Sequence, residues 1–173
     1  MVYVISGGPG FGKSVLIEKL RQLGYPIGGE VARQIIELQL KNGGIVLPWK
    51  DASAFEELVM KRRIEFLNSV NTEAIAFSDR GLPDQAAFSH FKGKEISPQL
   101  RTALSMNRYA KKVFLTPPWR QIYRNDDIRT ETFEEAERIH HFIEEAFLEN
   151  GYELIELPLV SPDKRIEFIL KSL

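Results

Sequence analysis

The sequence predicts an α/β fold in which a mostly parallel sheet is covered by helices on both faces. Short apolar segments alternate with segments of helical periodicity along the chain, and this alternation is typical of parallel sheets. The chain has 173 residues, of which 43% are hydrophobic, and this content suffices for a single core. No internal repeat, low-complexity tract or linker divides the sequence. We therefore expect one domain over residues 1–173.

The expected strands are short apolar runs, each followed by a helical pattern. In chain order they are Val2–Ile5, Tyr25–Ile27, Ala74–Phe77, Val113–Leu115 and Glu153–Leu157, of which the second is the weakest. Strands that alternate with helices imply right-handed crossovers between parallel neighbours. The crossover helices then lie on both sides of the sheet.

The expected helices carry apolar residues at intervals of three or four, which is the spacing of one helical face. A further helix follows the strand that ends at Phe77, and the long helix in the C-terminal third begins within residues 130–134. The periodic positions, helix by helix, are Leu16, Leu20 and Leu23, then Phe55, Leu58, Val59 and Phe66, then Ala136, Ile139, Ile143 and Ala146, and then Ile166, Ile169 and Leu173.

Composition excludes several classes of protein. The chain has 23 basic and 24 acidic residues and a net charge of -1, so no overall charge favours nucleic acid or a membrane surface as partner. It has no cysteine and three histidines, which excludes disulfides and thiolate metal sites. The apolar run Met1–Ile5 meets Gly7 too soon for a signal peptide or a membrane span. We expect a cytoplasmic protein, whose oligomeric state the sequence does not indicate.

A phosphate-binding loop (P-loop) is predicted between the first strand and the first helix. The segment fits the pattern G-x-x-x-x-G-K-[ST] in the strand, loop and helix context that the pattern requires. Glycines allow backbone N–H groups to surround an anion, and the helix start adds its positive dipole end. The expected nucleotide-binding residues are Gly7, Gly8, Pro9, Gly10, Phe11, Gly12, Lys13, Ser14 and Val15, together with Arg120 further along the chain.

Within this loop Lys13 is expected to reach the outer phosphates and Ser14 to bind Mg²⁺. The expected cofactors are therefore ATP and Mg²⁺, and the absence of an Asn-Lys-x-Asp guanine signature favours ATP over GTP. The alternative interpretation is a glycine-rich turn that binds no ligand.

Acidic residues follow the strand Ala74–Phe77. Asp79 is expected to act on magnesium, because a carboxylate at the end of a neighbouring parallel strand faces the same crevice as the P-loop. Its alternative role is to cap the next helix. Asp84 either contacts a substrate or is a first-turn acid favoured by the helix dipole.

Three further residues are candidates for the substrate side of the site. Glu30 closes the second strand region, where a carboxylate can orient or deprotonate a substrate hydroxyl. Arg33, one helical turn on, either binds a substrate anion or forms an ordinary i, i+3 ion pair with Glu30. Trp49 either stacks on a substrate ring or packs its loop onto the domain.

An arginine-bearing lid is predicted over about residues 117–131. Two prolines end the fourth strand, and Arg120, Arg124 and Arg129 then recur around a polar Asn-Asp-Asp sequence. Phosphoryl transfer spreads negative charge over the moving group, so a mobile segment that brings arginines over the P-loop is an expected part of such a site. The alternative is a solvated helix face.

These features together resemble a known family. The P-loop, Glu30 with Arg33, the sequence Asp79-Arg80-Gly81 with Asp84, and the segments TPPWRQIYRNDDIRT and GYELIELPL are similar to the AAA-domain family of predicted ATPases. The nearest characterised relatives of that family are bacterial nicotinamide riboside kinase domains, and deoxynucleoside and thymidylate kinases are more distant. The resemblance spans nearly the whole chain.

The resemblance implies a kinase-type strand order, 2-3-1-4-5. It also implies magnesium and phosphate roles for Asp79 and Arg80, a base or hydroxyl-positioning role for Glu30, and a lid role for Arg124 and Arg129. The strand before Asp79 lacks the Asp-Glu pair of motor-type ATPases, so no ring motor is implied.

The sequence therefore favours an ATP-dependent kinase that acts on a small hydroxylated acceptor, for which a nucleoside-like compound is one candidate. The alternative is a nucleotide-dependent switch, or a regulatory ATPase without an acceptor. Glu30 and the arginine segment favour the kinase, since a switch has no use for an acceptor base.

Overall fold

A five-stranded sheet forms the centre of the molecule. The computed structural model describes residues 1–124 and 131–173, and all strand pairs in it are parallel. The strand order is β2-β3-β1-β4-β5, which confirms the expected order. The strands are β1 (Val2–Ser6), β2 (Ile27–Gly28), β3 (Ala76–Asp79), β4 (Lys112–Leu115) and β5 (Glu153–Glu156).

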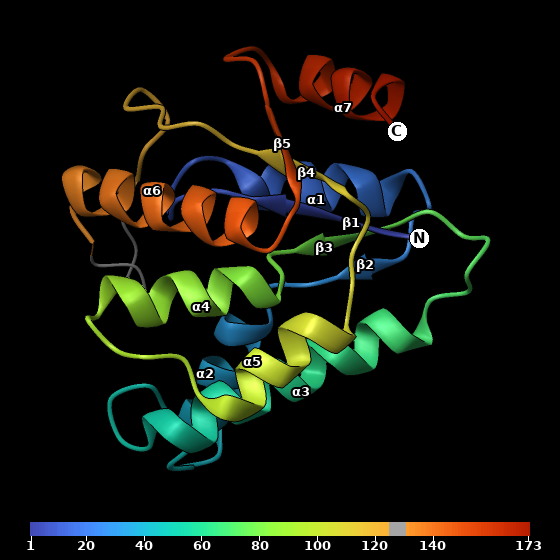
Figure 1. Cartoon of the computed structure of the whole chain (residues 1–173). Coiled ribbons are helices and arrows are strands. Elements are labelled where there is room, and N and C mark those ends of the chain that lie inside the picture. The colour runs from blue at the N-terminus through green and yellow to red at the C-terminus, as the bar shows by residue number, and fades with distance from the viewer. Residues whose placement is uncertain (125–130) are drawn as a thin grey trace.

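Helices cover both faces of this sheet (Figure 1). They are α1 (Lys13–Gln22), α2 (Val31–Lys41), α3 (Ala52–Ser69), α4 (Leu82–Phe91), α5 (Pro98–Met106), α6 (Phe133–Glu149) and α7 (Pro162–Lys171). Side chains of α1 and α7 pack on one face of the sheet, and those of α4, α5 and α6 pack on the other. The predicted α/β class with helices on both sides is confirmed.

The alternation of side chains along β1 explains how two cores form. Val2 and Val4 point into the core shared with α4 and α6, whereas Ile5 joins the core beneath α1 and α7. Successive strand residues face opposite sides of a sheet, so one central strand supplies both cores.

Two strands differ from the sequence prediction by more than one residue. β3 begins at Ala76 because the preceding residues form a turn, in which the Ala74 N–H bonds to Asn71 O at 3.0 Å. β2 has only two paired residues, Ile27 and Gly28. Gly28 packs tightly, since a Cβ there would lie 2.5 Å from the Phe66 ring.

α5 was not expected from the sequence. Its buried positions are Leu100, Ala103 and Leu104, which is too short an apolar pattern to stand out from a loop. Ser97 caps it by accepting a hydrogen bond from the Leu100 N–H at 3.1 Å, a favourable start for a helix.

The register of the sheet brings the predicted site residues together. Ile5 pairs with Asp79 and Ser6 pairs with Leu115, so β1, β3 and β4 end at one edge. Ligands of open parallel sheets bind at this edge.

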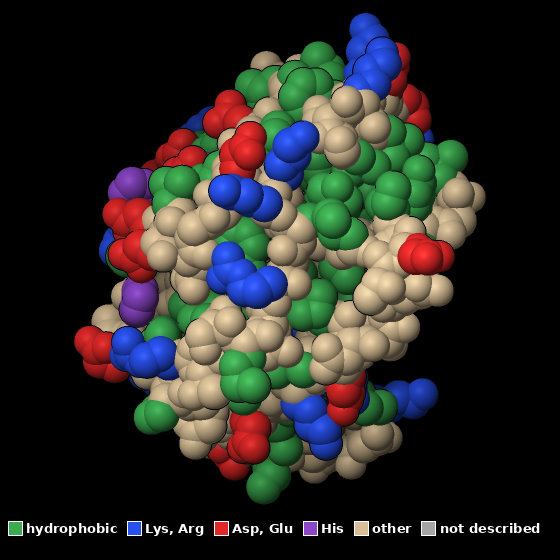
Figure 2. Space-filling view, turned by 45° about the vertical axis from the view of Figure 1, so that its right-hand side comes forward, with side chains coloured by type: hydrophobic (Ala, Val, Ile, Leu, Met, Phe, Trp, Pro, Cys, Tyr) green, Lys and Arg blue, Asp and Glu red, His purple; other side chains and the backbone are tan. Residues whose placement is uncertain are grey.

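The surface agrees with the nearly neutral composition. On the face shown in Figure 2, acidic and basic side chains are interspersed and neither forms a continuous patch. Across the described parts of the chain, no helix combines the length and apolarity needed to cross a membrane.

Candidate functional site

The loop after β1 has the backbone of an anion cradle. Gly7, Gly10 and Gly12 have φ angles of 128°, 80° and 86°. Residues other than glycine rarely adopt this backbone conformation. A Cβ at Gly7 would lie 2.4 Å from Thr116 O, and one at Gly10 would lie 2.5 Å from the Tyr123 ring. Glycine is therefore required here both by backbone conformation and by close packing.

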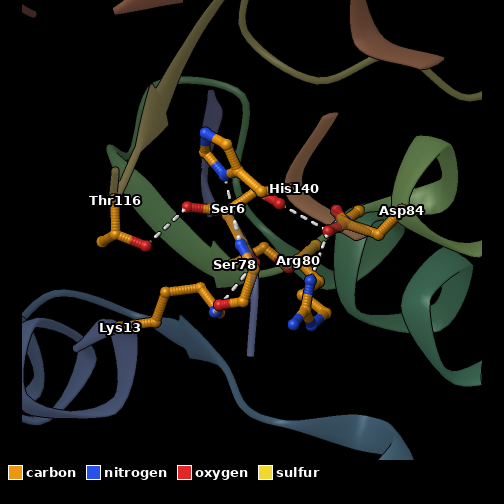
Figure 3. A network of polar contacts seen from close by, with 10 residues as sticks. Ser6, Lys13, Ser78, Arg80, Asp84, Thr116 and His140 are labelled. Carbon is orange, nitrogen blue, oxygen red and sulfur yellow. Dashed lines mark hydrogen bonds and ion pairs between the residues drawn. The ribbon is translucent and has the colours of Figure 1, made fainter. Parts of the chain in front are cut away.

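Lys13 lies across this loop at the first position of α1. Its side chain is buried, and Nζ donates to Gly7 O at 2.9 Å and to Gly8 O at 2.7 Å. Figure 3 shows the Lys13 side chain directed at the loop. These bonds hold the ammonium where it can meet an anion bound by the loop. Ser14 and Val15 are exposed at the helix start.

The side chain of Phe11 does not face the cradle. It is 0% exposed and packs with Phe133 and Tyr123 in a small aromatic cluster. Ring centroids lie 5.7 Å apart for Phe11 and Phe133 and 6.2 Å apart for Phe11 and Tyr123. Among the nucleotide-binding residues predicted, Phe11 can thus contribute only its backbone.

His140 of α6 supports the loop from behind. Its Nδ1 accepts a hydrogen bond from the Gly8 N–H at 3.2 Å, as drawn in Figure 3. Burial, with the nearby Lys13 and Arg80 cations, lowers the pKa of His140 to about 4. Glu144 lies 3.6 Å from Nε2 and favours the imidazolium, but burial outweighs it. His140 is therefore neutral at pH 7, as an acceptor at Nδ1 requires.

Asp79 ends β3 beside the loop. It is 4% exposed, and its Oδ1 is buried without a hydrogen-bond partner among the described residues. Burial raises the pKa of this carboxyl, while Lys13 and Arg80 act in the opposite direction. Asp79 does not cap the next helix, because the N-cap of α4 is Gly81.

Arg80 has a strained backbone with a φ of 70°. The hydroxyl of Ser78 donates to Arg80 O at 2.7 Å, and the guanidinium lies 5.1 Å from the centre of the Phe88 ring. Left-handed residues other than glycine persist where surrounding contacts hold them, often at functional sites.

Asp84 is fully buried and holds Arg80 in place. Its Oδ1 accepts from Arg80 Nη1 at 2.8 Å and from the Ser6 hydroxyl, and its Oδ2 accepts from the Gly81 N–H at 2.7 Å. Figure 3 shows Ser6, Asp84 and Arg80 joined in this network. These contacts favour the structural interpretation of Asp84, since it does not line the cavity described next.

A cavity of about 340 Å³ opens beside the P-loop. Pro9 of the loop, Glu30 and Arg33 of the α2 start, and Asp79 and Arg80 of the β3 end all line it. The Glu30 and Arg33 side chains form an ion pair at 3.3 Å, so the ordinary i, i+3 pair that was one interpretation exists within the wall of this cavity.

The rest of the cavity wall is supplied mainly by α3 and α4. Trp49 lines the cavity and is 61% exposed, which does not fit a ring that packs its loop onto the domain. Gln85 and Phe88, together with Phe55 and Arg63, also line the cavity and were not predicted as site residues. No sequence pattern distinguishes these four side chains from core residues.

The predicted lid arginines differ in what the structure describes of them. Arg120 Nη2 pairs with Glu134 Oε1 at 2.6 Å, and its guanidinium lies 4.2 Å from the Phe133 ring centre. Arg124 is exposed, and its Nη1 donates to Tyr123 O at 2.7 Å. Arg129 lies outside the described residues.

The fold and the loop together define a class. A parallel sheet in this strand order, with a glycine-rich P-loop between β1 and α1, is the kinase-like fold of P-loop nucleoside-triphosphate-binding proteins. Within that class the chain belongs to the AAA domain family, which matches residues 2–165. The predicted family is thereby confirmed.

Solved structures agree with this fold. Deoxyadenosine kinase from M. mycoides with bound dATP has a TM-score of 0.68 and 17% identity, with 99% of this chain and 98% of that chain covered. Thymidylate kinase from Ehrlichia chaffeensis has a TM-score of 0.66 and 14% identity, with 99% and 97% covered. NadR protein in complex with NR has a TM-score of 0.69 and 17% identity, with 98% of this chain and 50% of that chain covered. At these identities the likeness establishes the fold. A search of curated proteins gave no significant match.

Proposed function

We propose that the protein is an ATP- and Mg²⁺-dependent phosphotransferase that moves the γ-phosphoryl group to a hydroxyl of a small, nucleoside-like acceptor. The observation that carries this proposal is that the P-loop and the adjacent cavity have lining residues in common. Pro9 of the P-loop, Asp79 and Arg80 line the same cavity as Glu30. A triphosphate held by the loop would therefore end where a molecule in the cavity begins.

Different residues bind the phosphates and stabilise the charge that develops during transfer. The loop amides and Lys13 bind the β- and γ-phosphates. Arg80, which is fixed by Asp84, offers its guanidinium to the charge that develops on the transferred group. Arg124 and Arg129 are proposed to add to this charge stabilisation from the lid.

Glu30 acts at the acceptor hydroxyl. The hydroxyl oxygen forms a bond to the γ-phosphorus, and the bond from that phosphorus to the β–γ bridging oxygen breaks. The electron pair leaves with ADP, and the hydroxyl proton passes to the Glu30 carboxylate. Arg33, paired with Glu30 at 3.3 Å, orients this carboxylate.

A magnesium ion fits the residues beside the loop. The buried Oδ1 of Asp79, which has no hydrogen-bond partner among the described residues, and the exposed Ser14 hydroxyl would hold it, together with phosphate oxygens. Bound Mg²⁺ usually has one or two carboxylates plus phosphates and waters. The ion supplies neutralisation of phosphate charge. Within the described residues no group of three or more His, Cys, Asp or Glu side chains could hold a metal by itself.

The test is phosphoryl transfer by the pure protein with ATP, Mg²⁺ and a panel of nucleosides, sugars and vitamins, with products identified by mass spectrometry. Glu30→Gln should lower acceptor phosphorylation by about a hundredfold or more without weakening ATP binding. Glu37→Gln, an exposed change on the same helix, is the control and should have no effect. Release of ADP without any phosphorylated acceptor across the panel would instead favour the switch or ATPase alternative.

A further inference from the structure

The chain forms a turn at residues 119–123, after β4, and this turn packs on the P-loop. The Ile122 N–H closes the turn with a bond to Trp119 O at 3.2 Å. A Cβ at Gly12 would lie 3.0 Å from Ile122 Cδ1, and one at Gly10 would lie 2.5 Å from the Tyr123 ring. Both glycines belong to the anion cradle, so the turn contacts the backbone that would surround the phosphates.

Tyr123 joins this turn to two other parts of the molecule. Its ring centroid lies 6.2 Å from that of Phe11 in the P-loop and 5.3 Å from that of Phe133 at the start of α6. Its hydroxyl donates a hydrogen bond to the backbone oxygen of Glu131. Glu131 follows residues 125–130 in the chain, so Tyr123 ties together the two described ends of the predicted lid.

Arg124 follows Tyr123 and depends on it for its place. Its Nη1 donates to Tyr123 O at 2.7 Å, so the guanidinium is held at the turn and has to rotate to reach a phosphate. A charged group stabilises phosphoryl transfer only within hydrogen-bonding distance of the moving group, and a displacement of about 1 Å can greatly lower the rate. The support of Arg124 therefore bears on the transfer.

We propose that Tyr123 is a positioning residue that couples the P-loop to Arg124. An anion in the cradle fixes the backbone of Gly10, and the turn is fixed with it because the Tyr123 ring packs on Gly10 and Phe11. The hydroxyl bond to Glu131 holds the other end of the predicted lid at the same time. The inference rests on the proposed function, because it explains how a lid arginine of the proposed kinase is placed.

Trp119 allows a direct measurement of this coupling. It is the first residue of the turn, and its ring centre lies 4.8 Å from the guanidinium carbon of Arg165. The chain has two tryptophans, so in Trp49→Phe the fluorescence comes from Trp119 alone. The probe is inorganic triphosphate with Mg²⁺, because it fills the cradle without a base that could quench the indole.

The first experiment compares Trp49→Phe with the same protein carrying Tyr123→Leu, both saturated with inorganic triphosphate as established by calorimetry. We expect the probe to shift the Trp119 emission in Trp49→Phe. The shift should be lost with Tyr123→Leu, because leucine has neither the ring that contacts Gly10 nor the hydroxyl. Tyr25→Leu changes a half-buried tyrosine that packs on Phe77. It is the matched control and should retain the full shift.

The second experiment separates the placement of Arg124 from support of the fold. Tyr123→Phe keeps the ring and removes only the hydroxyl bond to Glu131. It should lower kcat by about fivefold and leave the KM for ATP unchanged, and Tyr25→Phe should change neither. In an Arg124→Ala background Tyr123→Phe should cause no further fall, because a residue that acts through Arg124 has nothing left to place.

Four results would overturn the inference. They are a Trp119 emission that the probe leaves unchanged in Trp49→Phe, an equal shift with Tyr123→Leu, loss of triphosphate binding with Tyr123→Leu, and an effect of Tyr123→Phe on kcat that is absent or equal in both backgrounds. Loss of binding would show that Tyr123 only maintains the loop. If no acceptor is phosphorylated, the proposed function fails, whereas the Trp119 shift and its loss still decide the coupling.

Discussion

Protonation of His140 should destabilise the protein in mild acid. The pKa of the folded form is lowered to about 4 from 6.5, so the neutral form is the one the fold prefers. Stability from this source is fully present above pH 6.5 and is lost as the pH falls toward 4. Linkage over that range gives a loss of about 2 kcal/mol by pH 5 and about 3 kcal/mol by pH 4. The imidazole is 5% exposed, so solvent screens little of this effect.

The assay is urea unfolding of the wild type and His140→Asn between pH 7 and pH 5. Asparagine retains a side-chain acceptor near the position of Nδ1, which accepts from the Gly8 N–H, but it does not titrate. Carboxylates change both proteins alike, so the difference between their unfolding free energies isolates the histidine. That difference should shift by about 2 kcal/mol against the wild type between pH 7 and pH 5. Parallel pH profiles would refute the reasoning.

Other substitutions test the nucleotide side of the site. Lys13→Ala should weaken ATP binding by about a hundredfold or more with an unchanged circular dichroism spectrum, and unaltered affinity would count against the P-loop assignment. Asp79→Asn should lower Mg²⁺-dependent turnover far more than ATP affinity. Asp79→Asn should also raise the free energy of unfolding at neutral pH. Burial raises the pKa of the Asp79 carboxyl, so the stability that its protonated form contributes is lost as the pH rises through that pKa. Equal turnover in the wild type and Asp79→Asn would contradict the metal role of Asp79. Arg124→Ala should lower kcat by about a hundredfold, and Arg124→Lys should restore little of it. Steady-state kinetics within twofold of the wild type in both would remove Arg124 from the site.

The parts of the site that were predictable from sequence are those whose function lies in the backbone or at a strand end. The positive φ angles and close neighbours of the P-loop glycines exclude other residue types at these positions. This requirement for glycine is therefore visible in the sequence pattern itself. Asp79 is the last residue of one strand of the parallel sheet and Glu30 follows another, so topology alone places them at a common edge.

The cavity floor was not predictable in the same way. Gln85 sits on α4 among buried residues, and its orientation is set by a backbone oxygen 29 positions earlier. Arg63 lies on a helix where basic residues are ordinary, and only packing shows that it is buried. The bond between His140 and Gly8 is a contact across 132 positions, which the periodicity of a helix does not encode.

The P-loop is held by residues that lie far along the chain, and this has a consequence for protein synthesis. The motif leaves the ribosome before the residues that support it: Thr116 bonds to Ser6 O across 110 positions, and His140 bonds to Gly8 across 132. The Phe11 ring is likewise covered only after Phe133 has been synthesised. A nascent chain that has emerged as far as β3 therefore carries every glycine of the cradle without the cradle's walls. A nucleotide bound by the cradle can therefore stabilise this domain only after α6 has emerged, and until then the Phe11 ring lacks its cover.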